Sequence, residues 1–121
     1  MNKEQNGNEL YPVLAAVNFL YLMAGISDPT DKDDDLAMEA IVYANPDLWV
    51  DKPMTHKEYA NRREFEIKSL SYFMRKRNYN DIKAIKFLEE YEQRELTALR
   101  AVISHPAFNY AQRTANTRSR A

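Results

Sequence analysis

The amino-acid sequence predicts an all-α fold, a small bundle of about four helices that includes an antiparallel helical hairpin at about 55–104. Three observations lead to this fold class. Only 2 of the 121 residues are glycine, so the chain is poor in the positive-φ turns that join short strands. Apolar residues recur at the spacing of amphipathic helices. Helix-capping residues stand where these patterns begin.

The chain length suits a single domain, which we divide into three parts. Residues 1–8 are expected to form a flexible polar leader. Residues 9–105 are expected to form one helical domain, followed by an extended basic tail at 106–121.

The tail carries arginines but no acidic residue, and it has few apolar anchors. Because it is too polar to form a core alone, it is either a frayed end or a docking arm that becomes ordered on a partner. Its candidate partner-binding residues are Phe108, Tyr110, Arg113, Arg118 and Arg120.

The first helix is expected from about Glu9 to Ala24, with Pro12 tolerated in its first turn. Its apolar residues cover most of the helix circumference, and such a helix must be covered on every side. Either it is the central helix of the bundle, which we favour, or one face binds another chain. In the second case Phe19, Tyr21 and Leu22 are candidate contact residues.

An acidic loop leads into a second helix, expected from about Asp33 to Ala44 and ended by Asn45-Pro46. The connector that follows holds the only tryptophan, Trp49. We expect Trp49 to pack against the helices as a plug, and contact with a partner is the alternative.

The third helix begins with a capping box formed by Thr55 and Glu58 and should continue to about Arg77. After a short turn, Asn80 can cap a fourth helix that runs from Asp81 to about Ser104. A short turn between two long helices predicts an antiparallel hairpin. The apolar stripe of the fourth helix consists of Ile82, Ile85, Leu88, Leu96, Leu99, Val102 and Ile103.

Glu89 and Glu92 fall within this stripe, and a buried carboxylate is costly unless it is paired. The hairpin geometry makes Arg62 and Arg63 the candidate partners of Glu92 and Glu95. An interhelical ion-pair layer, or a polar patch that faces a second subunit, explains these residues better than a carboxylate metal site. Such a metal site normally needs Glu-x-x-His pairs on facing helices.

The charge is distributed unevenly along the chain. Residues 1–60 carry 4 Lys and Arg against 11 Asp and Glu, whereas residues 61–121 carry 13 against 7. The two parts therefore have formal charges of −7 and +6. Such a chain can pair its own halves or associate head to tail with a copy of itself.

The sequence holds no recognisable catalytic or metal-binding motif. The absence of cysteine excludes a disulfide framework, a thiolate nucleophile and a cysteine zinc site. Asp31, Asp33 and Asp35 imitate a calcium loop, but Leu36 and Val42 occupy its glycine and glutamate positions. The two histidines, at the start of the third helix and the end of the fourth, are expected to lie far apart, and neither has triad partners. We expect no cofactor, no metal and no enzymatic activity.

The basic residues of the second half raise the alternative of nucleic-acid binding. Arg75, Lys76 and Arg77 are the possible phosphate contacts. Compensation of the helix dipole explains the same cluster, because these cations stand at the expected end of the third helix. The composition and the short apolar run near the N-terminus favour a cytoplasmic protein without a membrane span.

Residues 12–50 contain Leu14-Ala15-Ala16-Val17-Asn18, then Gly25-Ile26 and Pro29, then Asp35, Ala37 and Trp49. This segment resembles the opening of head–tail connector (adaptor) proteins of tailed bacteriophages. The resemblance implies a ring-forming virion component with extended termini that dock on neighbours. The long fourth helix and the basic tail depart from that pattern.

The sequence thus predicts a protein that acts by protein–protein contact, as an assembly subunit that forms homo-oligomers or binds other assembly proteins. The alternatives are a small inhibitor of a host enzyme and a nucleic-acid-binding helical module.

Overall fold

The computed structural model describes residues 3–108, and the side chains of residues 13–108. Its elements are α1 (Lys3–Ala24), α2 (Asp31–Ala44), the 3-10 helix η1 (Pro46–Leu48), α3 (His56–Arg77) and α4 (Ile82–Ser104). This confirms the all-α bundle and the antiparallel hairpin, formed by α3 and α4. The expected tail after residue 108 lies outside the described residues.

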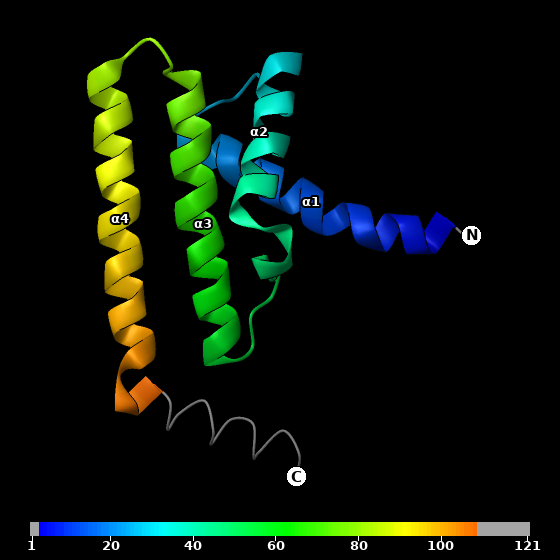
Figure 1. Cartoon of the computed structure of the whole chain (residues 1–121). Helices are drawn as coiled ribbons and strands as arrows, with labels where there is room; N and C mark the ends of the chain where they lie inside the picture. Colours follow the sequence, from blue (N-terminus) through cyan, green and yellow to red (C-terminus); the bar gives the residue numbers. More distant parts are fainter. Residues whose placement is uncertain (1–2, 109–121) are drawn as a thin grey trace.

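Figure 1 shows the arrangement of the helices. α2 and α4 lie on either side of α3, and α1 crosses behind α2 and α3. The N-terminal part of α1 projects away from the bundle.

Reciprocal capping boxes begin two of the helices. At α2, the Asp33 amide donates to Thr30 Oγ1 at 3.2 Å, and the Thr30 amide donates to the Asp33 carboxylate at 3.0 Å. At α3, Thr55 and Glu58 form the expected box, with both bonds at 3.1 Å. Each box satisfies two amides that a helix start leaves without partners. α2 begins two residues earlier than expected because Thr30 supplies its cap.

α4 is capped by Asp81 and not by Asn80. The Ala84 amide donates to Asp81 Oδ1 at 3.1 Å. Asp81 already has extended backbone angles, which is the conformation that a capping residue adopts.

α3, and not α1, is the central helix. α3 contacts α1, α2, η1 and α4. α1 buries Ala16 and Leu20, whereas Leu22 on another side remains 79% exposed. α1 also begins at Lys3, so residues expected in the polar leader form its first turns and Pro12 lies inside the helix. The expected central position is wrong because α2 and α3 cover each other and leave only one stripe for α1.

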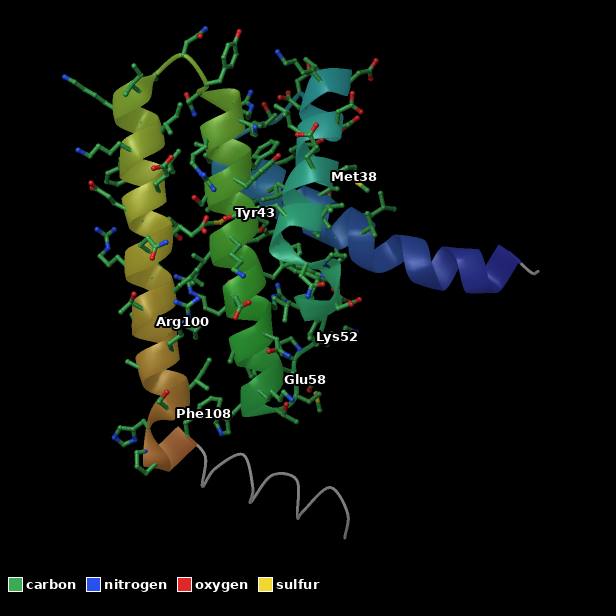
Figure 2. All side chains as sticks on the ribbon, viewed as in Figure 1. Met38, Tyr43, Lys52, Glu58, Arg100 and Phe108 are labelled. Atoms are coloured by element: carbon green, nitrogen blue, oxygen red, sulfur yellow. The ribbon has the colours of Figure 1, made fainter. Side chains whose placement is uncertain are left out.

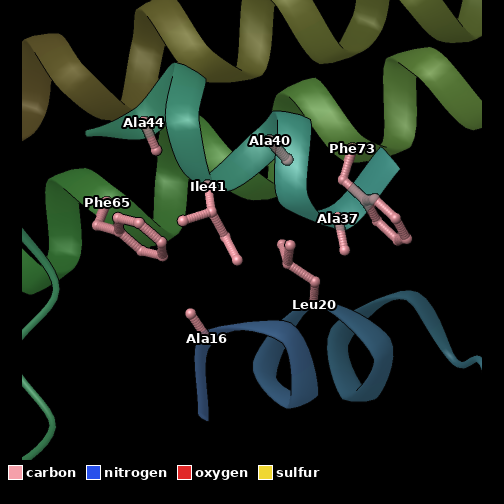
Figure 3. Close-up of a cluster of buried hydrophobic side chains, with 8 residues drawn as sticks. All are labelled: Ala16, Leu20, Ala37, Ala40, Ile41, Ala44, Phe65 and Phe73. Carbon is pink, nitrogen blue, oxygen red and sulfur yellow. The ribbon is translucent and has the colours of Figure 1, made fainter. Parts of the chain in front are cut away.

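The core lies where α1, α2 and α3 meet (Figure 3). α2 contributes small side chains that allow the other helices to approach closely, and α3 contributes two fully buried rings. The cluster consists of Ala16, Leu20, Ala37, Ala40, Ile41, Ala44, Phe65 and Phe73. This arrangement of small against large side chains allows dense packing.

α4 buries less than its apolar stripe predicts. Among the described residues its main contacts are with α3, and it buries Glu92 and Leu96. Ile82 and Val102, both expected in the stripe, are exposed. One neighbouring helix covers only a narrow strip of α4, so residues at the edges of the stripe face solvent. No helix in the described part of the chain is long and apolar enough to cross a membrane.

The core predicts a clear difference between two phenylalanines. Phe65 is fully buried and Phe87 is exposed. We expect Phe65→Ala to lower the free energy of unfolding by about 3–5 kcal/mol, because it removes a buried ring and leaves a cavity. The control Phe87→Ala should change it by less than about 0.5 kcal/mol. Urea unfolding followed by circular dichroism measures both, and equal losses would contradict this core.

Candidate functional site

A polar junction joins three helices around Glu92 of α4. The Tyr43 hydroxyl of α2 donates a hydrogen bond to Glu92 Oε2 at 2.7 Å. Arg75 of α3 donates from Nη2 to Glu92 Oε1 at 3.2 Å. Both carboxylate oxygens are therefore satisfied, as a nearly buried carboxylate requires. The expected pairing of Glu92 with Arg62 or Arg63 is wrong, because Arg75 and a tyrosine from α2 occupy its surroundings.

Two stacked tyrosines extend this junction. The rings of Tyr43 and Tyr72 lie 4.8 Å apart with an interplanar angle of 26°. The Arg75 guanidinium lies 5.7 Å from the centre of the Tyr43 ring, a cation–π distance. The Tyr72 hydroxyl donates to Glu39 Oε2 at 3.3 Å. The junction thus consists of alternating carboxylates, phenols and a guanidinium.

Burial and neighbouring carboxylates raise the pKa of both phenols. Burial raises the pKa of Tyr43, and its hydrogen bond to Glu92 raises it further. Burial also raises the pKa of Tyr72, with the Glu39 charge as the next cause. A phenol is already protonated at neutral pH, and a raised pKa makes it hold that proton more strongly, so both hydroxyls are hydrogen-bond donors and poor general bases. These hydrogen bonds give the two tyrosines a structural role, in which they join neighbouring helices.

Arg62 and Arg63, the two arginines of the candidate ion-pair layer, have different partners. Arg62 pairs with Glu66 at 3.3 Å and donates to the carbonyl oxygens of Val50 and Asp51 at 3.2 and 2.8 Å. Arg63 lies 3.8 Å from Glu95, so this expected ion pair is confirmed.

Trp49 packs as a plug, as expected. Its ring lies 6.0 Å from Phe19 of α1 and 5.2 Å from Phe65 of α3. The Arg62 guanidinium covers the ring at 4.5 Å. Trp49 Nε1 is buried and has no hydrogen-bond partner among the described residues. These contacts place Trp49 and Phe19 within the internal packing.

A second polar junction lies where α2 begins and α3 ends. Arg77 Nε donates to Asp33 Oδ1 at 3.1 Å. The Thr30 amide and then the Arg77 guanidinium hold the pKa of Asp33 below its usual value. The Tyr21 hydroxyl donates to Asp34, which fixes the end of α1 to the same corner.

The possible phosphate contacts are mostly engaged by these junctions. Arg75 pairs with Glu92 and Arg77 pairs with Asp33. The Lys76 ammonium lies 5.4 Å from the centre of the Tyr72 ring. A cation already paired with a carboxylate contributes less to phosphate binding, because the bridge must first be broken.

The expectation that the two histidines lie far apart is wrong, because the hairpin brings both to one pocket. His56 and His105 line one surface pocket with Ala101, Val102, Ala107 and Phe108. The Phe108 ring lies 5.8 Å from His56, and the Ala107 amide donates to His105 Nδ1 at 3.0 Å. In an antiparallel hairpin the first residue of one helix lies near the last residue of the other. The positions of His56 and His105 in the sequence could therefore have predicted that they lie close together. Among the described side chains, residues 13–108, no group of three or more potential ligands could hold a metal ion.

The exposed side of α2, which sequence reasoning missed, has an acidic half and an apolar half. We define the α2 face as the set Asp31, Asp35, Met38 and Val42. These residues lie on one side of the helix because they are spaced by three or four positions. Val42 is 71% and Met38 44% exposed. Figure 2 shows Met38 pointing away from α3. A shallow pocket beside this face is lined by Met38, Glu39, Val42, Tyr43 and Tyr72.

The remaining candidate contact residues are distributed as follows. Leu22 is exposed on α1, whereas Tyr21 and Phe108 are half-buried. Tyr110, Arg113, Arg118 and Arg120 lie outside the described residues.

Removal of the central carboxylate should loosen the polar junction. We expect Glu92→Ala to lower the free energy of unfolding by about 1–3 kcal/mol, because Tyr43 and Arg75 lose their shared acceptor. Glu90→Ala, an exposed neighbour on the same helix, should change it by less than about 0.5 kcal/mol. Urea denaturation measures both, and an equally small effect of the two substitutions would contradict a stabilising junction.

The second junction predicts a dependence of stability on acid pH. The folded pKa of Asp33 lies below its usual value of 3.8, so its contribution is fully present above that value. It is lost as the pH falls through the folded pKa, because the unfolded chain binds the proton first. Asp33→Asn should therefore reduce the slope of unfolding free energy against pH between about 5 and 2. Arg77→Met should reduce it partly, and unchanged slopes would argue against this linkage.

Comparison with known proteins finds no family model, no curated protein and no solved structure that matches this chain.

Proposed function

We propose that the protein is a non-enzymatic assembly subunit that associates with further copies of itself through the α2 face. The observation that carries the proposal is the exposure of Val42 and Met38 on a helix whose opposite side is fully buried. Contiguous exposed apolar side chains with a polar rim are typical of protein–protein contact surfaces.

The charge distribution supports self-association over contact with an unrelated protein. Residues 1–60 carry −7 and residues 61–121 carry +6, so two copies attract each other in a head-to-tail orientation. Asp33–Arg77 joins these two parts within one chain, whereas the ion pairs of Glu64, Glu66, Glu92 and Glu95 stay within the second part. Exposed acidic groups of the first part thus remain available to a neighbour.

The resemblance of residues 12–50 to phage head–tail connectors supports a narrower version of the proposal, a ring subunit of a virion. Head-to-tail association of identical subunits produces closed rings when the rotation between neighbours closes. Negative-stain electron microscopy would distinguish such rings from simple dimers.

Replacement of Val42 tests the proposed contact. We expect the mass of the wild-type protein, measured by size exclusion with light scattering, to rise with concentration. Val42→Lys should weaken this association at least about tenfold, because it removes an apolar contact and adds a charge of the same sign as the basic partner. Its melting temperature should change little, since Val42 is exposed.

Val102→Lys is the matched control, because Val102 is 56% exposed on α4, outside the α2 face. This variant should associate like the wild type. A wild-type protein that stays monomeric at high micromolar concentration would overturn the proposal. Equal effects of the two substitutions would show that the contact does not use the α2 face.

A further inference from the structure

We infer that the α2 face binds the C-terminal basic segment, residues 109–121, of a second copy of this chain. The inference rests on the proposed self-association and names the segment that makes the contact. Its basis is the match between the two chemical halves of the α2 face and the composition of this segment.

The α2 face presents acid at one end and apolar side chains at the other. Asp31 and Asp35 are exposed, and neither forms an ion pair with another described residue. The segment 109–121 carries one aromatic residue, Tyr110, followed by three arginines and no acidic residue. Arginine and carboxylate form strong charge-assisted hydrogen bonds, and a tyrosine ring can cover exposed apolar side chains.

The spacing of the two partners also matches. Asp31 precedes Met38, and Asp35 precedes Val42, by the same seven positions. Seven helical residues span about 10 Å. In an extended chain, the three positions from Tyr110 to Arg113 also span about 10 Å. A tyrosine on the apolar half therefore places the first arginine at the acidic half.

The reach of the chain favours a neighbouring molecule as the source of this segment. Phe108 contacts His56, the first residue of α3, and Figure 2 shows Phe108 at that end of the hairpin. The α2 face lies near the other end of α3, because Tyr43 stacks on Tyr72. From His56 to Tyr72 α3 rises about 24 Å, whereas two residues beyond Phe108 reach at most about 7 Å.

Tyr110 therefore cannot reach the α2 face of its own chain while Phe108 keeps its contact. The segment of one molecule binds the face of the next, and each molecule offers one face and one segment. Such a heterologous contact repeats from copy to copy and leads to rings or filaments.

Charge reversal on each side of the contact tests the inference in the full chain. The first variant carries Arg113→Glu, Arg118→Glu and Arg120→Glu, and the second carries Asp31→Lys and Asp35→Lys. Light scattering should show each variant alone associating at least about a hundredfold more weakly than the wild type, because like charges then meet. An equimolar mixture should regain the wild-type mass, since each segment again meets a face of opposite charge.

A matched control reverses three exposed cations of α4 with Lys83→Glu, Lys86→Glu and Arg100→Glu. It has the same net charge as the first variant, so it separates the position of the charges from their sum, and its association should weaken far less than that of the first variant. If the lysines impair folding of α2, as seen by circular dichroism, Asp35→Lys alone replaces the second variant.

Failure of the inference can be separated from failure of the proposed function. If the first variant assembles normally while Val42→Lys does not, self-association stands and the basic segment is not the partner. If both reversals abolish association and the mixture does not regain it, direct pairing of segment and face is overturned. A monomeric wild-type protein would overturn the proposed function itself, and with it this inference.

Discussion

The packing of α2 on α3 determines the positions of the other elements. Ala37, Ala40 and Ala44 form the small side of α2, so that the rings of Phe65 and Phe73 fill the space beside it. The stripe left between these two helices receives α1, and the opposite side of α3 receives α4. Small residues on α2 are thus a steric requirement, because a larger side chain at any of the three positions would separate the helices that the rest of the bundle contacts.

Ion pairs and aromatic contacts fix this helix pair at several levels. Asp33–Arg77 joins α2 to the end of α3, and the Tyr43–Tyr72 stack joins them further along. Beyond the C-terminal end of α2, Trp49 contacts Phe65 of α3. Each level links residues that are distant in sequence, so the register between α2 and α3 is specified several times. A helix that is held in register in this way presents its outer side, the α2 face, in a fixed position, which favours binding because little order must be created on contact.

Local signals in the sequence predicted the parts of the fold that depend on local chemistry. The Thr55 and Glu58 box, the end of α2 at Asn45 and the short turn between α3 and α4 are all encoded within a few residues. The ion pair of Arg63 with Glu95 followed from the hairpin alone.

The errors concern the choice among alternative helix neighbours. The apolar circumference of α1 indicates that this helix must pack against other elements. The same pattern does not indicate which helix lies at the centre of the bundle. Glu92 was recognised as a residue that requires a partner, yet its partners Tyr43 and Arg75 depend on where α2 packs. The exposed α2 face was missed for the same reason, because exposure of Val42 is a property of the packed bundle.

α4 is held less firmly than the other helices, because it has fewer neighbours. Among the described residues α4 rests mainly on α3, and the Tyr43 hydroxyl of α2 donates a hydrogen bond to Glu92 of α4. A helix with one neighbour can separate at a lower free energy than helices with several. The described residues thus form a three-helix body and an outer layer, α4, that the Tyr43–Glu92 hydrogen bond joins to α2. Transient opening of that layer would uncover one side of α3 while leaving the body, and the α2 face on it, intact.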